Sequence, residues 1–316
     1  MHKLVKLVSI ILSLTCLGVS SCSNGNNEGT GASEKLLPGL HLQAGEKYYY
    51  TIINETNTAL EINDQKIKTK KVVEIGIIYN TAKDSAGNIL LKLTYDKFHV
   101  VLKDKDGEEQ VMDAANADVS ENLMDKLLKN IKGNSLEITI NNKGEILKIT
   151  GTKEINDKLM QQLSTFDVNE KKQIASQLSQ LTGDEFIKNN FQPNFKLFPD
   201  TAIYKGESWH RKNVQSGDLP FEADTKYTLN DIDNNMAEIS SESKIKNTAD
   251  SHSNLLGTEA QINITGKQTG IFKSDLHTGM LLKAKTNTQI EGTITVINHE
   301  VPVTVEIKKE ISTRKM

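Results

Sequence analysis

The chain has 316 residues, a formal net charge of −3 and 5% aromatic residues, a length that suits one large or two modest domains. Its only arginines are Arg211 and Arg314. Nucleic-acid binding is therefore disfavoured, because arginine is the preferred donor of paired hydrogen bonds to phosphates and base edges. Trp209 is the only tryptophan, which also disfavours a large sugar-binding cleft built on aromatic platforms.

The chain begins with the organisation of a bacterial export signal. Lys3 and Lys6 precede an apolar run over residues 7–17, which is shorter than the roughly 20 residues that a membrane-spanning helix needs. Residues 19–22 (Val-Ser-Ser-Cys) then resemble the bacterial lipobox, in which the cysteine thiol receives diacylglycerol before cleavage. The alternative is an ordinary secretory signal that is cut near a stray thiol. We expect removal of residues 1–21 and lipidation of Cys22.

The mature chain then has one cysteine, because Cys16 leaves with the signal. Disulfides, cysteine-based zinc sites and cysteine nucleophiles are thereby excluded. Loss of the two signal lysines lowers the formal charge from −3 to −5. The Gly/Asn/Ser-rich residues that follow predict a flexible tether over residues 22–36.

The N-terminal part of the body is predicted to be an antiparallel meander. Strand-forming segments over 41–53, 71–79 and 89–95 are rich in β-branched and aromatic residues, as strands usually are. Asp84–Asn88 has turn composition, and Asp104–Gly107 separates two further short apolar runs as a hairpin turn does.

The middle of the chain is predicted to be mainly helical. Leu123, Leu127 and Ile131 recur at helical spacing after Asp118 or Ser120, either of which could cap the helix. A hairpin follows over 136–149, and two more helices are expected: one around Ile155, Leu159 and Leu163, the other from Asn169 with Ile174, Leu178 and Leu181. Gly183 is expected to break or kink the latter helix before Phe186.

After Pro193 and Pro199 the strand pattern returns. Alternating apolar and polar residues predict strands with one buried face and one solvent-exposed face. These segments are 207–211, 225–229, 236–240, 261–265, 270–273, 280–284, 293–297 and 303–307.

Two motifs accompany this order of elements: Gly206-Glu207-Ser208-Trp209, and residues 270–279 (Gly-Ile-Phe-Lys-Ser-Asp-Leu-His-Thr-Gly). With the lipobox and the β-rich body they resemble uncharacterised Bacteroidota lipoprotein families. The architecture is more distantly similar to the half-barrel lipoprotein carriers LolA and LolB, in which a curved sheet wraps helices around an apolar cavity. Some Bacteroidota lipoproteins have an acidic cluster after the cysteine that directs them to the cell surface. Close to the cysteine, over residues 23–33, the only acid is Glu28, so the resemblance implies the periplasmic face of the outer membrane.

Asp275-Leu276-His277-Thr278-Gly279 combines an acid, a histidine and a hydroxyl. A catalytic role is one interpretation, but its position between two strand patterns favours a hairpin loop in which Asp275 binds local amides and Gly279 adopts a positive φ. Trp209 and His210 could form a binding pair, yet a single tryptophan in a strand is typical of a core anchor whose neighbour faces out.

Metal and hydrolase motifs are incomplete. Asp231–Asn235 resembles the start of a calcium loop, but Met236 replaces the required glycine and no glutamate stands at the twelfth position, so only a looser cation site remains open. His299-Glu300 lacks the second histidine of a zincin, and no nucleophile elbow, Walker loop or dinucleotide fingerprint occurs. We predict no catalytic residue, no metal and no cofactor.

Two tripeptides match the O-glycosylation acceptor pattern of Bacteroidota envelope proteins: Asp84-Ser85-Ala86 and Asp200-Thr201-Ala202. A chain of this length contains about one such match by chance, so the pattern alone is weak. Both lie in expected surface turns, as acceptors must. Ser85 and Thr201 are therefore candidate modification sites.

The sequence thus predicts an α+β fold: a large, curved, half-barrel-like antiparallel sheet over residues 37–316, with a helical insert at about 117–192 packed on one face. We expect a non-enzymatic, outer-membrane-anchored protein that binds or carries an apolar ligand or an envelope component. A structural or interaction subunit of an envelope protein complex, without a small ligand, is the alternative, and a hydrolase of unrecognised type is a third reading.

Overall fold

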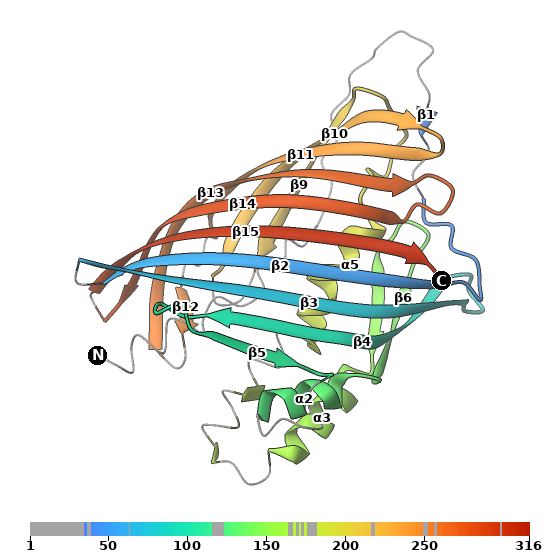
Figure 1. Cartoon of the computed structure of the whole chain (residues 1–316). Coiled ribbons are helices and arrows are strands. Elements are labelled where there is room, and N and C mark those ends of the chain that lie inside the picture. Colours follow the sequence, from blue (N-terminus) through green and yellow to red (C-terminus); the bar gives the residue numbers. More distant parts are fainter. Residues whose placement is uncertain are drawn as a thin grey trace.

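A computed structural model describes residues 35–36, 39–62, 64–115, 123–163, 167–168, 171, 174–175, 182–215, 219–248, 252–255, 258–297 and 299–316. Within these ranges a 13-stranded antiparallel sheet dominates the molecule and curves strongly (Figure 1). The sheet is not closed, because its edge strands β7 (Ile146–Thr150) and β9 (Ser208–Gln215) do not pair with each other. The predicted large curved antiparallel sheet is confirmed.

The N-terminal meander consists of β2 (Lys47–Ile62), β3 (Gln65–Lys83), β4 (Ile89–Lys103) and β5 (Glu109–Asp113). Both predicted turns are present. In the first, the Asp84 carboxylate accepts hydrogen bonds from the backbone N–H groups of Ala86 and Asn88 at 2.9 and 2.8 Å. Asp104 does the same in the second turn, so a short side chain stabilises each reversal locally.

The described part of the middle segment combines helices with one hairpin, as the sequence predicts. Its described elements are α2 (Leu123–Ile131), β6 (Ser135–Ile140), β7, α3 (Thr152–Gln162) and α5 (Asp184–Phe195). The hairpin β6–β7 continues the main sheet, because β5 pairs with only the last residues of β4 and leaves residues 89–94 to pair with β6. The hairpin predicted over 136–149 is confirmed as β6–β7, whereas the packing of a helical insert at about 117–192 on one face of the sheet stays a prediction.

The individual helix predictions fared unevenly. The helix around Ile155 and Leu159 is confirmed as α3, and α5 begins directly after Gly183, which therefore does interrupt the helix. The proposed caps of α2 and most of the helix from Asn169 lie outside the described residues. Helices α2 and α3 contact each other, and α2 also contacts β5 at the edge of the sheet (Figure 1).

The C-terminal half is a second meander. Its elements are β8 (Ile203–Tyr204, paired with β1, Lys35–Leu36), β9, β10 (Phe221–Asp233), β11 (Met236–Asn247), β12 (His252–Leu255), β13 (Thr258–Asp275), β14 (Leu281–Val296) and β15 (His299–Lys315). Several are longer than predicted. The segments 261–265 and 270–273 are one strand, and so are 280–284 and 293–297.

The two meanders join through strands that are distant in sequence. The main path of the sheet runs β7-β6-β4-β3-β2-β15-β14-β13-β11-β10-β9. Strand β2 pairs with β15 along nearly its whole length, from Leu60 opposite Val303 to Tyr48 opposite Lys315. The first long strand and the last strand therefore lie side by side near the middle of the sheet.

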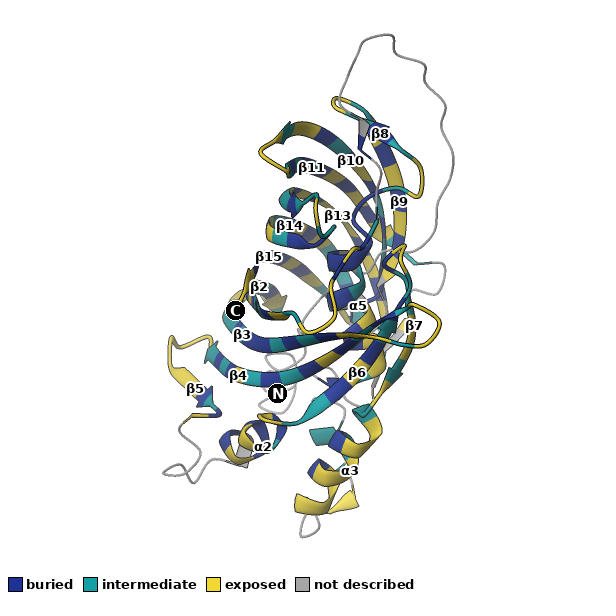
Figure 2. Ribbon diagram, turned by 90° about the vertical axis from the view of Figure 1, so that its right-hand side faces the viewer, coloured by how far each residue is buried: buried dark blue, intermediate teal, exposed yellow. Residues whose placement is uncertain are grey.

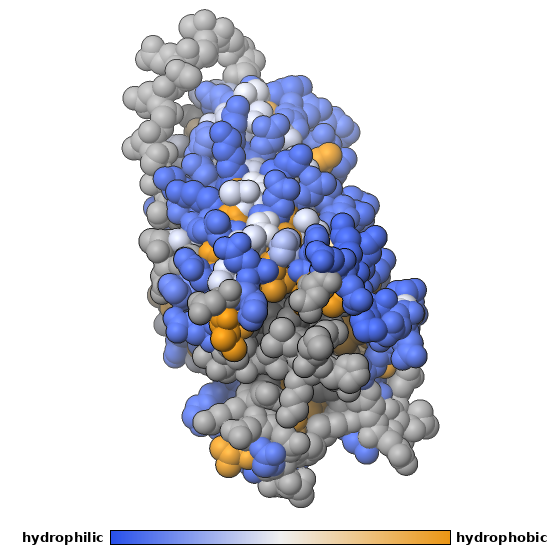
Figure 3. All heavy atoms as spheres, turned by 90° about the vertical axis from the view of Figure 1, so that its left-hand side faces the viewer, coloured by the Kyte–Doolittle hydropathy of each residue, from blue (hydrophilic) through white to orange (hydrophobic). Residues whose placement is uncertain are grey.

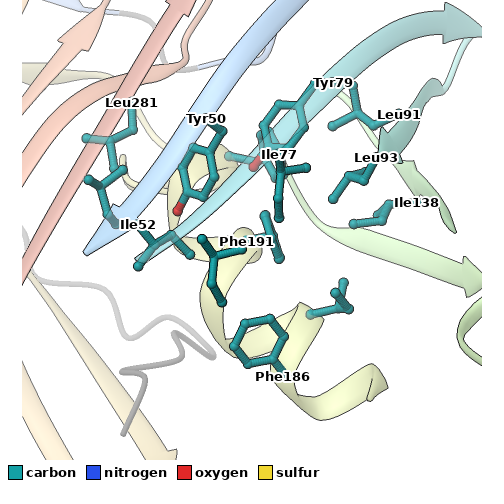
Figure 4. Close-up of a cluster of buried hydrophobic side chains, with 14 of the residues drawn as sticks. Tyr50, Ile52, Ile77, Tyr79, Leu91, Leu93, Ile138, Phe186, Phe191 and Leu281 are labelled. Carbon is teal, nitrogen blue, oxygen red and sulfur yellow. The ribbon is translucent and has the colours of Figure 1, made fainter. Parts of the chain in front are cut away.

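Burial alternates along every long strand, which defines an inward and an outward face (Figure 2). At one end of the inward face lies a core cluster to which strands and all three described helices contribute. Phe191 of α5 is fully buried there, with its ring centroid 5.4 Å from that of Tyr50 and 6.0 Å from that of Tyr79 (Figure 4). These aromatic contacts fix α5 against β2 and β3.

Candidate functional site: the inward face of the sheet

A polar band crosses the middle of the inward face. The register aligns two adjacent rows of inward residues, the first running from Thr56 on β2 to Arg211 on β9 and the second from Asn54 on β2 to Trp209 on β9. The polar members of the band are Asn54, Thr56, Lys71, Arg211, Thr225, Ser241, Ser243, Gln268, Thr286, Thr288 and Lys309. An antiparallel sheet normally buries apolar side chains on such a face, so the band is unusual.

Beyond the band the face becomes apolar again. We call this second group the strand-borne cluster. It comprises Leu60, Leu219, Phe221, Ala223, Ile245, Ala260, Ile262, Ile264, Ile290, Ile294, Val303, Val305 and Ile307. In the described part of the chain no helix contributes to it, in contrast to the core cluster. The inward face thus has two apolar zones with the polar band between them.

Several members of the band satisfy one another. The Gln268 side-chain amide donates to the Thr288 hydroxyl at 2.7 Å, and the hydroxyls of Thr225 and Ser243 are hydrogen-bonded at 2.8 Å. Arg211 is buried and donates to the backbone carbonyls of Lys196 and Phe198, which ties β9 to the segment after α5. Lys71 and Lys309 each have an interaction partner as well.

Three side chains of the second row have no hydrogen-bond partner. Both ends of the Asn54 amide, the Ser241 hydroxyl and the Trp209 indole N–H are buried and unpaired. Leaving a buried polar group unpaired costs about 1 to 3 kcal/mol. Such groups are rare in folded proteins and call for a specific explanation.

The aromatic end of the second row is rigid. Trp209 stacks on Tyr227 with ring centroids 5.4 Å apart and on Phe198 at 6.4 Å, so two aromatic neighbours hold the indole in place. Burial raises the pKa of Tyr227, although the nearby charge of Arg211 acts in the opposite direction. The phenol therefore stays neutral. The prediction that Trp209 is a core anchor and that His210 faces outward is confirmed, since the His210 side chain is 60% exposed.

A separate hollow of about 1040 Å³ lies on the outward face. It is lined by three consecutive residues of each of β2, β13, β14 and β15, by residues of β3, and by the end of β4 with the turn that follows it. Lys66, Lys68, Lys70, Lys103, Lys105 and Lys267 face three acids there, Asp104, Glu291 and Glu306. Among the described residues Lys66, Lys68 and Lys267 have no ion-pair partner. We call this feature the lysine hollow.

Two candidate residues of the sequence analysis lie where modification requires them. Ser85 and Thr201 are both exposed in turns, which leaves O-glycosylation at these hydroxyls a prediction. Cys22, the predicted anchor, lies outside the described residues, as does the whole signal.

The Asp275–Gly279 segment is a turn, as favoured by the sequence. The Asp275 carboxylate accepts hydrogen bonds from the backbone N–H and the hydroxyl of Thr278 at 2.8 and 3.1 Å. Gly279 has φ +74°, and a Cβ there would lie 1.9 Å from the carbonyl oxygen of Gly39. The acid and the hydroxyl are thus used to build the loop, and only glycine fits its final position.

The other motif residues are not brought together. Asp231–Asn235 ends β10 and turns into β11, with positive φ at Asn234 and Asn235 as a tight hairpin turn requires. The described histidines pair singly with carboxylates or stand apart, and within the described ranges no three histidine, cysteine or acidic residues are grouped as metal ligands.

The sequence analysis missed the polar band. Its members belong to eight different strands, and only the register shows that they are neighbours. One sequence signal was available: Asn54, Gln268 and Ser241 each occupy an inward position in an alternating strand, where an apolar residue is expected.

In the part of the chain that the structure describes, no helix combines the length and apolarity that crossing a membrane requires.

A model of the family described as "Family of unknown function (DUF6263)" matches residues 86–281. No curated protein matches the chain.

Two solved structures illustrate how loosely the fold resembles known ones. Lipovitellin, in a structure of its lipid–protein interactions, gives a TM-score of 0.47 at 10% sequence identity. The match covers 86% of this chain and 25% of the lipovitellin chain, so this chain spans about a quarter of that protein. An outer membrane channel from Pseudomonas putida F1 gives a TM-score of 0.25 at 6% identity over 91% of this chain and 100% of its own. At these TM-scores neither likeness bears on function.

Proposed function

The chain belongs to this family of unknown function (DUF6263), and from that premise we propose that it is a non-enzymatic binding protein that carries an amphiphilic ligand on the inward face of its sheet. The observation that supports the proposal is the division of this face into two apolar zones separated by the polar band. Such a face matches a molecule with an apolar tail and a polar head.

The two apolar zones differ in what they do for the fold. The core cluster packs side chains of α2, α3 and α5 against side chains of the strands, and so holds these helices to the sheet. The strand-borne cluster, as far as the structure describes the chain, joins strands that their backbone hydrogen bonds already hold together. Its apolar side chains are thus the ones that a ligand tail could contact without displacing a described helix. Figure 3 views this end of the molecule, where hydrophobic atoms lie among hydrophilic side chains.

The proposed location follows from the sequence. A diacylated Cys22 followed by the tether would hold the body close to a membrane, and we place it on the periplasmic face of the outer membrane. A protein at that position is suited to exchange amphiphiles with the bilayer to which it is anchored.

The proposal predicts that an amphiphile copurifies with the protein. A full-length Cys22→Ser chain, purified without detergent, should yield a stoichiometric amphiphile on solvent extraction and mass spectrometry, and after delipidation it should bind dodecanoate by calorimetry. Ile262→Thr in the strand-borne cluster should weaken this binding about tenfold, because the ethyl group of the isoleucine is replaced by a hydroxyl.

The control is Asn263→Thr, which introduces the same residue on the outward face of the same strand. It should leave binding unchanged. Absence of both a copurifying amphiphile and dodecanoate binding would refute the proposal.

The lysine hollow favours a second candidate function, the binding of an acidic envelope protein without a small ligand. Its unpaired lysines form a cationic surface on a chain with net negative charge, and charge complementarity of this kind guides association. The Lys66→Glu/Lys68→Glu double variant should abolish crosslinking in cells to such a partner, whereas Lys92→Glu, at the other end of the sheet, should not. Equal crosslinking of all three proteins would exclude the hollow as the interface.

A further inference from the structure

The second row of the polar band carries the buried side chains that lack partners. Asn54, Ser241 and Trp209 are 2%, 3% and 8% exposed, and their polar atoms are unpaired. All three lie in one row of residues that are opposite one another on successive strands. The row runs Asn54, Lys309, Thr286, Gly270, Ser241, Tyr227, Trp209. Other buried unpaired atoms belong to Tyr79, Thr313 and Asn287, which lie outside the band.

We propose that this row is the binding site for the ligand's headgroup, and that the headgroup is uncharged and rich in hydroxyl groups, like that of a glycolipid. This inference rests on the proposed function and names the class of amphiphile that the inward face selects. The unpaired groups supply the reason, since a bound headgroup would satisfy donors and acceptors that the chain itself leaves unpaired.

The kinds of unpaired atom define the headgroup chemistry. The Trp209 indole and the Asn54 amide nitrogen can only donate, the Asn54 carbonyl oxygen can only accept, and the Ser241 hydroxyl can do both. A carboxylate or phosphate offers acceptors alone, and an ammonium group offers donors alone. Hydroxyl groups offer both, and burying them costs far less than burying a charge.

The spacing of the row sets the size of the headgroup. Neighbouring strands lie about 4.8 Å apart, so Ser241 and Trp209, two strands apart, are separated by roughly 10 Å. Asn54 lies four strands from Ser241, or roughly 19 Å along the sheet, and less across its concave face. A headgroup of one or two sugar rings spans the first interval, and a longer one is needed to reach Asn54.

The position of the row beside the strand-borne cluster sets the orientation. The row of Ser243 and Gln268 separates Ser241 from the cluster, and these two residues are already hydrogen-bonded to Thr225 and Thr288. A tail on the cluster therefore passes over a satisfied row before the headgroup reaches the unsatisfied one. Because Trp209 stacks on Phe198 and Tyr227, the headgroup is expected to meet the indole at its unpaired N–H rather than at a ring face.

A series of probes with one tail and different heads tests the inference. Dodecyl maltoside below its micelle concentration, dodecanoate and dodecane share a twelve-carbon chain. On the delipidated full-length Cys22→Ser protein, we expect dodecyl maltoside to bind at least tenfold more tightly than dodecanoate, and dodecane most weakly. If none of the three binds, the proposed function fails; if dodecanoate binds as tightly as the maltoside, only the headgroup inference fails.

Substitutions on the row add a readout that a structural role would not give. Ser241→Ala should weaken dodecyl maltoside binding about tenfold, the typical effect of one lost hydrogen bond. Dodecanoate binding should not change. The melting temperature of the ligand-free protein should stay the same or rise. Ser240→Ala is the matched control, since Ser240 faces outward and donates to Asn230.

Asn54→Leu, which keeps the size of the side chain, should act like Ser241→Ala on a longer glycolipid headgroup such as that of a dodecyl maltotrioside. If Ser241→Ala and Asn54→Leu both bind their maltose-based probes as tightly as the unsubstituted protein does, ordered water rather than a headgroup pairs these side chains and the inference is overturned.

Discussion

A Phe191→Ala variant is expected to lose about 3 to 5 kcal/mol of unfolding free energy, the usual range for removing a buried phenylalanine. Phe191 is fully buried, and besides Tyr50 and Tyr79 its ring contacts Phe186 at a centroid distance of 6.3 Å. Its loss would leave a cavity where α5 meets β2 and β3, which the rigid sheet cannot collapse to fill. Urea denaturation followed by tryptophan fluorescence would measure the loss.

Met160→Ala provides the comparison, because Met160 lies on α3 with its side chain exposed. It should change the unfolding free energy by less than about 0.5 kcal/mol, as surface substitutions usually do. A loss below about 1 kcal/mol for Phe191→Ala would mean that α5 is not part of the cooperative core.

Cys22→Ser is expected to release the protein from the membrane completely, because the serine hydroxyl cannot take the place of the acylated thiol. Two or more acyl chains give stable anchoring, whereas the unlipidated tether over residues 22–36 offers a bilayer only Ala32 and Leu36 as apolar side chains. Fractionation of cells into membrane and soluble pools, with mass spectrometry of the mature N-terminus, would show the change.

The sequence offers a matched control in its other cysteine. Cys16→Ser changes a residue of the predicted signal and should leave the mature protein lipidated and in the membrane pool. Retention of the Cys22→Ser protein in the membrane pool, or release of both variants, would contradict Cys22 as the anchor.

Local features of the fold were predictable from the sequence because they depend on neighbouring residues. The Asp84 and Asp275 turns formed as expected, since each is stabilised by hydrogen bonds within five residues. Helix α3 also formed as its apolar spacing predicts.

The lengths of the strands were not predictable in the same way. The sequence divided β13 between Thr265 and Gly270 and β14 between Ala284 and Thr293, and each gap contains the polar residues of the band. Inward residues such as Gln268 and Thr288 interrupt the apolar alternation that marks a strand. The strand prediction therefore failed at the band itself, because the inward residues there are polar although the strands continue through it.

Strand order was beyond sequence reasoning altogether. The pairing of β6 with β4 depends on how far β5 extends along β4, and the pairing of β2 with β15 joins residues more than 240 positions apart. No local pattern carries this information. The candidate site is built from eight strands, so it could not be found before the order and register were known.

The pairing of β2 with β15 also affects how the chain can acquire its structure. β15 is synthesised after every other strand of the sheet, yet it lies between the two meanders and forms ladders with both β2 and β14. Until it arrives, each meander has an open edge of unpaired backbone groups, which is a template for intermolecular pairing. The final strand therefore ends the period in which the growing chain is most vulnerable to aggregation.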